Sequence, residues 1–304
     1  MKVSVEQTDP ATGKKETVLQ PQIRPMTVQD LLRHTAGLVY DPPIGNGPVP
    51  EAYREANVRD RDSTLAEMVT KISKLPLANQ PGEVWEYSFA TDVLGRVIEV
   101  VSGSTLDRFV EERVTGPLGM SSTGFYLRET DRDRLAQPQI DAASGKRPPW
   151  FDATQKPKLL SGGGGGISTA SDYLLFCRML LQGGKLGSTR LLSQSTINLM
   201  TSNALKPGIA YSAATLQRFG DIGPTPAMGQ GFGLGFAVRT EAGNNPLPGS
   251  AGSFYWTGAY GTTFFVDPKQ ELVIIMMIQV PGPANSFYRR AIRYLAYQAL
   301  TSLD

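Results

Sequence analysis

The 304-residue sequence contains one cysteine and one histidine. A single cysteine excludes a disulfide within the chain and any cysteine-based zinc site. A single histidine excludes His-rich metal sites and leaves His34 as the one candidate base for a Ser-His-Asp triad. We therefore expect neither a cysteine-based nor a histidine-rich metal site.

Strong charge and long apolar runs are also lacking. Lysine and arginine number 30 against 28 aspartate and glutamate, and the net charge of +2 does not favour nucleic acid as a partner. No apolar run approaches the roughly 20 residues of a membrane span. Residues 1–16 are polar and contain no signal-peptide core, so the compartment, cytoplasm or periplasm, stays open.

Helical patterns dominate the first two thirds of the sequence. Thr27 with Asp30, and Thr64 with Glu67, have the spacing of a capping box at the start of a helix. The segment 90–102 carries an apolar stripe at helical spacing that ends at Gly103. We expect helices at all three places.

The pattern changes to that of strands after residue 230. The run "LVIIMMIQV" (272–280) is continuously apolar, as expected of a central strand covered on both faces. The last segment is typical of an amphipathic helix with Phe287, Ala291 and Leu295 inward. Together these patterns predict an α+β fold, with an antiparallel sheet flanked by helices and a mostly helical region.

Two features suggest chemistry but have simpler interpretations. His34 could act as a base, yet the sequence has no G-x-S-x-G elbow, and a hydrogen bond to the local backbone explains it equally well. The run "SGGGGGIS" (161–168) could bind a phosphate, but it lacks the Gly-Lys-Ser/Thr ending of a P-loop. A flexible turn beside a pocket is the simpler interpretation.

The aromatic-rich segment "GSFYWTGAYGTTFFVDP" (252–268) is different. Its periodicity predicts a strand, in which Trp256 could simply pack. However, the small residues Thr257, Gly258 and Ala259 follow at once. Small residues let a substrate approach the backbone closely, where an amide N–H could hold an oxyanion.

Four segments in the same order resemble the serine β-lactamase and penicillin-binding-protein family, and most closely its family VIII carboxylesterases. They are "MTVQDLLRHTAGL", "QPGEVWEYSFATDVLGRVIEVVSG", "GGGGGISTASDYLLFCRMLLQGG" and "GSFYWTGAYGTTFFVDP". The likeness extends over nearly the whole chain. The family combines an S-x-x-K motif, a Y-x-N or Y-S-x motif and a K-T-G or W-x-G motif. Tyr87-Ser88-Phe89 matches the second motif, and Trp256-Thr257-Gly258 matches the third.

The resemblance implies a β-lactamase-like fold and a serine hydrolase that acts through an acyl-enzyme on an ester or amide, with neither a metal nor an organic cofactor. Tyr87 would take and return the proton of the nucleophile, and Ser88 would fix the pocket by hydrogen bonds. The Ala259 amide would supply half of an oxyanion hole beside Gly258. Trp256 stands where many relatives have the lysine that attracts the carboxylate of β-lactams, which favours short-chain or apolar neutral esters.

The S-x-x-K motif itself is lacking, because no serine in the sequence is followed by lysine three places on. We therefore expect the serine, its lysine, the first strands and one helix upstream of Met1, and the 304-residue chain alone to be inactive. The expected regions are 1–25 (start of the α/β region), 26–205 (mostly helical), 206–227 (connecting loop) and 228–304 (α/β region with the sheet hairpin and last helix). A homo-oligomer or a complementing N-terminal segment could cover the sheet.

Three alternatives stay open. The protein could be a catalytically inactive member that binds peptidoglycan peptides or a protein partner. It could be a truncated product with neither role. It could also have β-lactamase or D-Ala-D-Ala peptidase activity.

Overall fold

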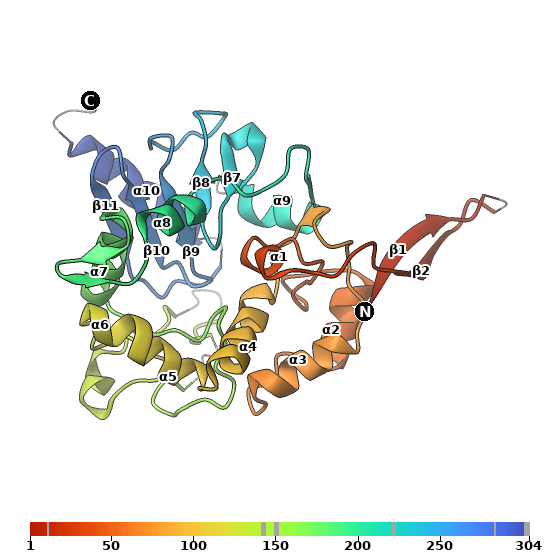
Figure 1. Cartoon of the computed structure of the whole chain (residues 1–304), viewed down its shortest axis with the longest axis horizontal. Helices are drawn as coiled ribbons and strands as arrows, with labels where there is room; N and C mark the ends of the chain where they lie inside the picture. The colour runs from red at the N-terminus through yellow and green to blue at the C-terminus, as the bar shows by residue number, and fades with distance from the viewer. Residues whose placement is uncertain (11, 141–143, 149–151, 221–222, 283, 301–304) are drawn as a thin grey trace. The chain divides into compact units, whose positions relative to one another are not determined.

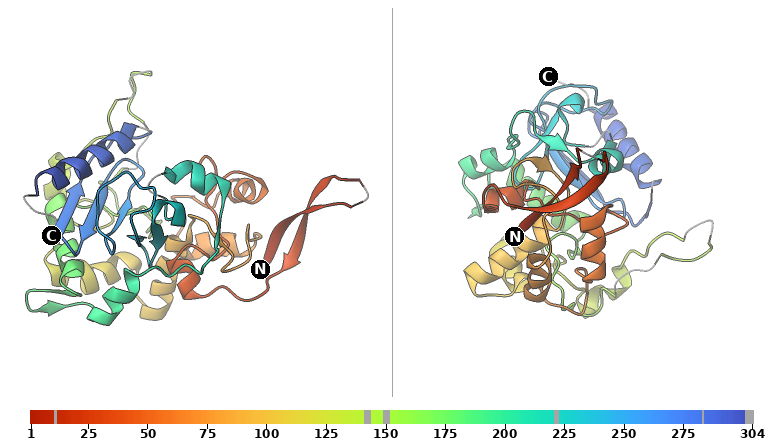
Figure 2. Two further views of the ribbon diagram at one scale, coloured as in Figure 1. Left: turned by 90° about the horizontal axis from the view of Figure 1, so that it is seen from above. Right: turned by 90° about the vertical axis from the view of Figure 1, so that its right-hand side faces the viewer.

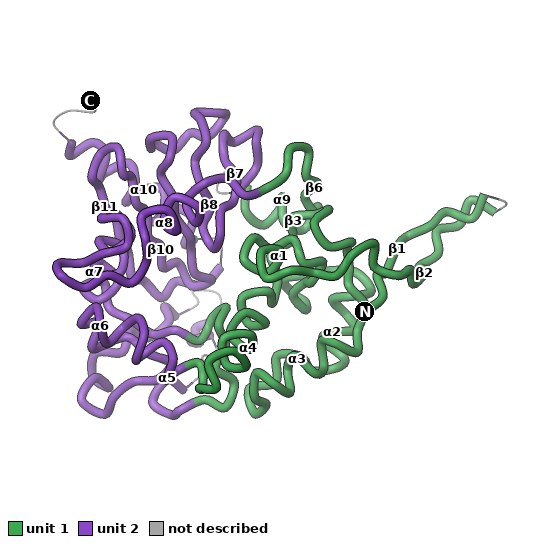
Figure 3. Tube along the Cα trace, viewed as in Figure 1, with its two compact units in different colours: residues 1–106, 157–165, 205–223 green, residues 107–156, 166–204, 224–304 purple. Residues whose placement is uncertain are grey.

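The structure is a computed structural model that describes residues 1–304 except 11, 141–143, 149–151, 221–222, 283 and 301–304. It contains helices and antiparallel strands, which confirms the α+β prediction (Figure 1). Contacts divide the chain into two compact units (Figure 3). Unit 1 comprises Met1–Leu106, Pro157–Gly165 and Leu205–Gly223, and unit 2 comprises Asp107–Lys156, Gly166–Ala204 and Pro224–Asp304. The four regions expected from the sequence follow different boundaries and stay a prediction.

Unit 1 is built mainly from short helices. Its helices are α1 (Val28–Leu32), α2 (Pro48–Glu55), α3 (Leu65–Ser73), α4 (Ala90–Ser102) and α9 (Ala213–Phe219). Its strands are β1 (Lys2–Thr8), β2 (Lys15–Pro21), β3 (Val84–Trp85) and β6 (Ala210–Tyr211). The segment 206–227, expected as a loop, therefore contains a strand and a helix.

Strands β1 and β2 form an antiparallel hairpin that is a two-stranded sheet of its own. Residues 1–25, expected to begin the α/β region, thus belong to unit 1. Val3 anchors the hairpin, because it is buried and forms an isolated bridge with Leu77. A second small sheet pairs β3 with β6 in parallel and fixes the backbone just ahead of Tyr87.

The predicted helix starts are confirmed. Thr27 and Asp30 form a complete capping box at α1, and Thr64 and Glu67 form one at α3. Helix α4 ends at Gly103, as expected.

Unit 2 contains the larger sheet. Its α-helices are α5 (Leu106–Val110), α6 (Gly116–Leu118), α7 (Ala170–Leu181), α8 (Gln194–Met200) and α10 (Ala284–Gln298). The first residue of α5 belongs to unit 1. Unit 2 also contains the π-helix η1 (Glu111–Thr115) and the 3₁₀-helices η2 (Glu129–Arg134) and η4 (Pro226–Met228). Its strands are β4 (Lys185–Leu186), β5 (Thr189–Arg190), β7 (Gln230–Phe232), β8 (Ala237–Arg239), β9 (Phe254–Thr257), β10 (Thr263–Asp267) and β11 (Leu272–Met276). Strands β4 and β5 form a hairpin, and the other five form an antiparallel sheet in the order β11-β10-β9-β8-β7.

The two faces of this sheet pack against different helices. Phe254 and Phe264 point to the face that packs with Cys177 and Met179 of α7. Side chains alternate along a strand, so Phe265 points to the other face, which α10 covers. Figure 2 shows α10 lying along the sheet on that side.

Helix α10 buries a face that periodicity did not predict. Phe287 and Leu295, expected inward, are 69% and 61% exposed. The buried positions include Arg293 and Tyr297. Arg293 places its guanidinium 3.8 Å from the centre of the Phe265 ring and donates from Nε to the Pro248 carbonyl at 2.6 Å. These partners offset part of the cost of burying a charged residue, and the apolar stripe is left outside.

Candidate active site

Tyr87 lies between β3 and α4 in unit 1 and is half-buried. Three rings surround its own ring, with centroid distances of 4.8 Å to His34, 5.2 Å to Tyr40 and 5.3 Å to Phe219. The pairing of β3 with β6 holds the preceding residues in place. Tyr87 is thus fixed on its sides while part of it stays accessible.

Ser88 points into the protein rather than to the surface. Its side chain is only 1% exposed, and its Oγ lies 3.4 Å from Nδ1 of His34. Burial lowers the pKa of His34 to about 3, so this imidazole is neutral at ordinary pH. A serine this deeply buried cannot be reached by an ester, so the pair holds the segment together and is unsuited to nucleophilic attack.

Tyr40 is a neighbour of Tyr87 that the sequence reasoning missed. It is buried, and its ring centroid lies 4.4 Å from that of Phe89 and 5.2 Å from that of Tyr87. Burial, and then the nearby Tyr87 and Asp92, raise the pKa of Tyr40 well above its usual range. The one feature of the sequence that could have pointed to Tyr40 is its position shortly after the "HTAGL" segment.

A buried carboxylate connects this region to the glycine-rich run. Asp92 accepts hydrogen bonds from Ser161 Oγ at 2.5 Å and from the Gly163 amide at 3.3 Å. Burial raises the pKa of Asp92 despite these bonds. A side chain at Gly163 would meet Asp92 and the Tyr40 hydroxyl, so the glycine run is a packing feature in contact with α4.

Arg59 supplies a cation beside the aromatic rings. Its Cζ lies 5.6 Å from the Tyr40 ring centre and 5.4 Å from that of Phe89. It also pairs with Asp41 at 2.5 Å. Phe89, which stands where many relatives have an asparagine, therefore packs under a guanidinium.

The other predicted site residues lie in unit 2, at the end of β9. Trp256 is half-buried, and its ring meets Phe232 edge-on at 5.3 Å. The Gly258 amide donates to the Thr262 carbonyl at 2.8 Å, and a Cβ at this position would lie 2.1 Å from Thr262 Oγ1. A side chain at this position would therefore displace the Thr262 hydroxyl. Ala259 is exposed, and its carbonyl accepts from Asn285 at 3.1 Å.

Ala259 occupies the second position of the turn that the Gly261 amide closes on the Gly258 carbonyl at 3.1 Å. A turn of this kind uses the carbonyl of its first residue and the amide of its fourth. The Ala259 amide is therefore not needed by the turn itself. The roles expected for Tyr87, Ser88, Trp256, Gly258 and Ala259 stay predictions, with Tyr87 and Ser88 placed in unit 1 and the others in unit 2.

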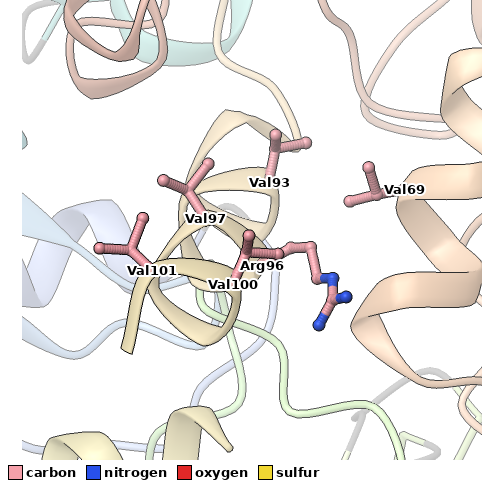
Figure 4. A pocket seen from close by; sticks show the side chains of 6 residues that line it. All are labelled: Val69, Val93, Arg96, Val97, Val100 and Val101. Carbon is pink, nitrogen blue, oxygen red and sulfur yellow. The ribbon is translucent and has the colours of Figure 1, made fainter. Parts of the chain in front are cut away.

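An apolar groove between α3 and α4 does not have the chemistry of an active site (Figure 4). It is lined by Val69, Val93, Arg96, Val97, Val100 and Val101. Arg96, its one ionisable residue, pairs with Glu99 at 3.0 Å. The predicted apolar stripe of α4 thus lines a surface groove, while Ala90, Asp92 and Gly95 form the buried face.

The described residues contain no group of three or more His, Cys, Asp or Glu side chains placed to hold a metal ion. None of the helices in the same part of the chain has the length and apolar character that a membrane crossing requires.

Comparison with known proteins defines the class. The family described as Beta-lactamase matches residues 10–299. An uncharacterized protein of Mycobacterium tuberculosis is 36% identical over 281 residues, which cover 89% of this chain and 66% of that protein. Esterase EstB of Burkholderia gladioli is 30% identical over 280 residues, which cover 88% of this chain and 69% of EstB. The chain spans about two thirds of the length of these relatives.

A solved structure agrees with the sequence matches. EstCE1, a hydrolase with promiscuous acyltransferase activity, superimposes with a TM-score of 0.71 at 28% identity, covering 94% of this chain and 74% of EstCE1. The chain therefore belongs to the Beta-lactamase family, within the superfamily of serine β-lactamases and penicillin-binding proteins, and has esterases among its relatives. The β-lactamase-like fold and the resemblance inferred from the four segments are confirmed.

Proposed function

We propose that the protein is a serine carboxylesterase that hydrolyses short-chain or apolar esters through an acyl-enzyme. The observation that carries the proposal is Trp256, a half-buried apolar ring on β9 at the place of the family's lysine. A lysine would attract a substrate carboxylate, whereas an indole ring offers an apolar wall. The esterase relative EstB and the hydrolase EstCE1 support this choice.

The proposed reaction uses a serine and a lysine outside residues 1–304, which in the family's order precede residue 1. The serine oxygen attacks the ester carbonyl carbon while its proton passes to the Tyr87 oxygen, which the neighbouring lysine would hold ionised as the phenolate. Tyr87 returns the proton to the departing alkoxide, and water then hydrolyses the acyl-enzyme by the same route. The exposed Ala259 amide would donate to the oxyanion, and Ser88 would hold His34 against the Tyr87 ring.

The proposal is tested with a fluorophosphonate probe and intact-mass measurement on two proteins. The first is the chain 1–304, and the second is the product of the whole open reading frame, including any codons in frame before Met1. The chain 1–304 should give no stoichiometric adduct, because no serine in it has a lysine three places on. The longer product should be labelled on a serine of an S-x-x-K motif. An adduct on Ser88, Ser161, Ser168 or Ser253 of the chain 1–304 would show that the nucleophile lies within it.

Substrate choice is measured on a fresh sample of the longer product that has not been treated with the probe. It should hydrolyse short-chain p-nitrophenyl esters much faster than penicillins, and Trp256→Lys should move the ratio towards penicillins. Ala251→Lys is the matched control, since it adds the same charge at an exposed position of the same unit. A preference of the unsubstituted product for penicillins would show that the Trp256 argument is wrong.

A further inference from the structure

We propose that Arg289 is a positioning residue for the Ala259 amide, which it orients by binding the carbonyl of Gly258 in the same peptide group. The purpose of this orientation, donation to the oxyanion of an ester substrate, rests on the proposed function. The hydrogen bonds that fix the amide lie within unit 2 and can be measured without catalysis.

Two side chains of α10 bind consecutive carbonyls of the turn 258–261. The Gly258 carbonyl accepts a hydrogen bond from Nη2 of Arg289. The Ala259 carbonyl accepts one from Nδ2 of Asn285, a buried residue, at 3.1 Å. Because Asn285 and Arg289 are four residues apart on the helix, they lie on one face of it and reach neighbouring peptide groups.

A close approach of the backbone brings the turn to this face of α10. Gly261 has a φ of 102°, and a Cβ at this position would lie 2.8 Å from Cδ1 of Ile278 and 3.0 Å from Cβ of Asn285. Beside it, the Val280 amide donates to the Tyr260 carbonyl at 2.7 Å. The turn is therefore held by backbone contacts as well as by the two side chains.

A hydrogen bond to the Gly258 carbonyl also sets the direction of the Ala259 N–H. The two groups belong to one planar trans peptide, in which the C=O and the N–H point in opposite directions. The Gly261 amide donates to the same carbonyl at 3.1 Å, and Arg289 adds a donor from a different element. The Ala259 N–H thus points away from Arg289, and among the described residues it donates to no acceptor.

The charge of Arg289 strengthens this effect. A guanidinium is always cationic, and a hydrogen bond from an ionised donor is roughly twice as strong as one between neutral groups. Hydrogen-bonded groups polarise one another, so a cation on the Gly258 oxygen makes the N–H of the same peptide group a better donor. Asn285 is neutral and binds the next peptide group along the chain. Arg289 is therefore the residue expected to control the Ala259 amide.

The test follows the Ala259 N–H of the ¹⁵N-labelled chain 1–304 by NMR relaxation. Its order parameter should be near about 0.85, as in rigid backbone, and Arg289→Met should lower it towards about 0.6. Arg178→Met is the matched control, because it removes the same group from an exposed position of α7 in the same unit. Equal order parameters of Ala259 in the two variants would overturn the proposal.

A second measurement serves if Arg289→Met does not fold by circular dichroism. It compares the Nε–H order parameters of Arg289 and Arg178 in the unsubstituted chain. An Arg289 side chain held on the Gly258 carbonyl should be rigid, whereas the exposed Arg178 should be mobile. Equal mobility of the two side chains would overturn the proposal.

The consequence for catalysis is measured on the longer product. Arg289→Met should lower kcat for a short-chain p-nitrophenyl ester by about tenfold, less than the roughly 10²- to 10³-fold loss when an oxyanion donor is removed. KM should change little, because the oxyanion develops only in the transition state. A lower order parameter with an unchanged kcat would uphold the positioning by Arg289 and count against the oxyanion role in the proposed function. The two failures are therefore distinguishable.

Discussion

His34 shows how one residue can look catalytic in the sequence and be structural in the protein. It adopts a left-handed backbone conformation (φ 56°), unusual for a residue other than glycine. Its ring packs against Trp85 and Tyr87, and it is almost completely buried. An imidazole in this position is neutral and contributes to stability through packing.

The pH dependence of stability should reveal this neutral state. The pKa of His34 is about 3 in the folded chain, against an ordinary value of about 6.5 in the unfolded chain. As the pH falls below about 6.5, the unfolded chain binds a proton that the folded chain does not. Stability is then lost by up to about 1.4 kcal/mol per pH unit. His34→Asn, which tolerates the left-handed conformation, should lack this contribution.

The measurement is the free energy of unfolding in urea between pH 8 and pH 4. The difference between wild type and His34→Asn should be constant above pH 7.5 and shrink steadily below pH 6.5. A constant difference over the whole range would mean that His34 has the same pKa in the folded and the unfolded chain.

At the scale of elements, the start of α1 depends on one buried carboxylate. Asp30 accepts two hydrogen bonds from Arg24, at 2.7 and 2.9 Å, and one from Arg33 at 3.0 Å. It also accepts from the hydroxyls of Thr27 and Thr35. Burial alone would raise the pKa of Asp30, but these hydrogen bonds outweigh it and hold the pKa well below its usual range.

Asp30→Asn should lower the free energy of unfolding at pH 7 by about 3 kcal/mol, because it leaves buried donors without a charged acceptor. Because the pKa of Asp30 is lower in the folded chain than in the unfolded chain, its ionised form stabilises the fold at pH values above the unfolded pKa of about 3.9. This stabilisation is lost as the pH falls towards the pKa of the folded chain. The difference in free energy of unfolding between the wild type and Asp30→Asn should therefore become smaller below about pH 4. Asp133→Asn, at an exposed position, should change stability by less than about 0.5 kcal/mol. Equal effects of the two variants would contradict the account.

Elements fixed by local chemistry could be predicted, and those fixed by distant contacts could not. The capping box of Thr27 with Asp30 is a spacing of three residues, so it is visible in the sequence. The contact of Tyr40 with Tyr87 joins segments far apart in the chain, and neither periodicity nor a motif records it. The hydrogen bond from Ser161 to Asp92 also joins segments far apart in the chain, and no sequence pattern records it. The aromatic neighbours of Tyr87 were therefore missed, although Tyr87 itself was found by its motif.

For the whole molecule, the sheet of unit 2 has an unusual edge. The apolar run expected in a central strand forms β11, which is the last strand of the sheet in the described part of the chain. Helices α7 and α10 contact β11, and the exposed Phe287 and Leu295 belong to α10. An apolar edge strand without charged or proline residues favours pairing with another chain.

The chain 1–304 should consequently self-associate with rising concentration. Leu295→Lys should weaken this association without reducing the free energy of unfolding, since Leu295 is exposed. Gln298→Lys, an exposed polar position on the same helix, is the control. Sedimentation velocity over a range of concentrations measures the effect. A monomer at every concentration, or equal behaviour of the two variants, would contradict the prediction.

The single cysteine gives this protein a practical property. Cys177 is a residue of α7 whose side chain lies in the core that packs against the sheet. Burial raises the pKa of its thiol to about 12. A thiol reagent acts on the thiolate, so Cys177 is unreactive in the folded chain at neutral pH. A cysteine introduced at an exposed position, such as Val101 on α4, would be the one site to take up a spectroscopic label. Labelling of Cys177 itself would then report the opening of the core directly.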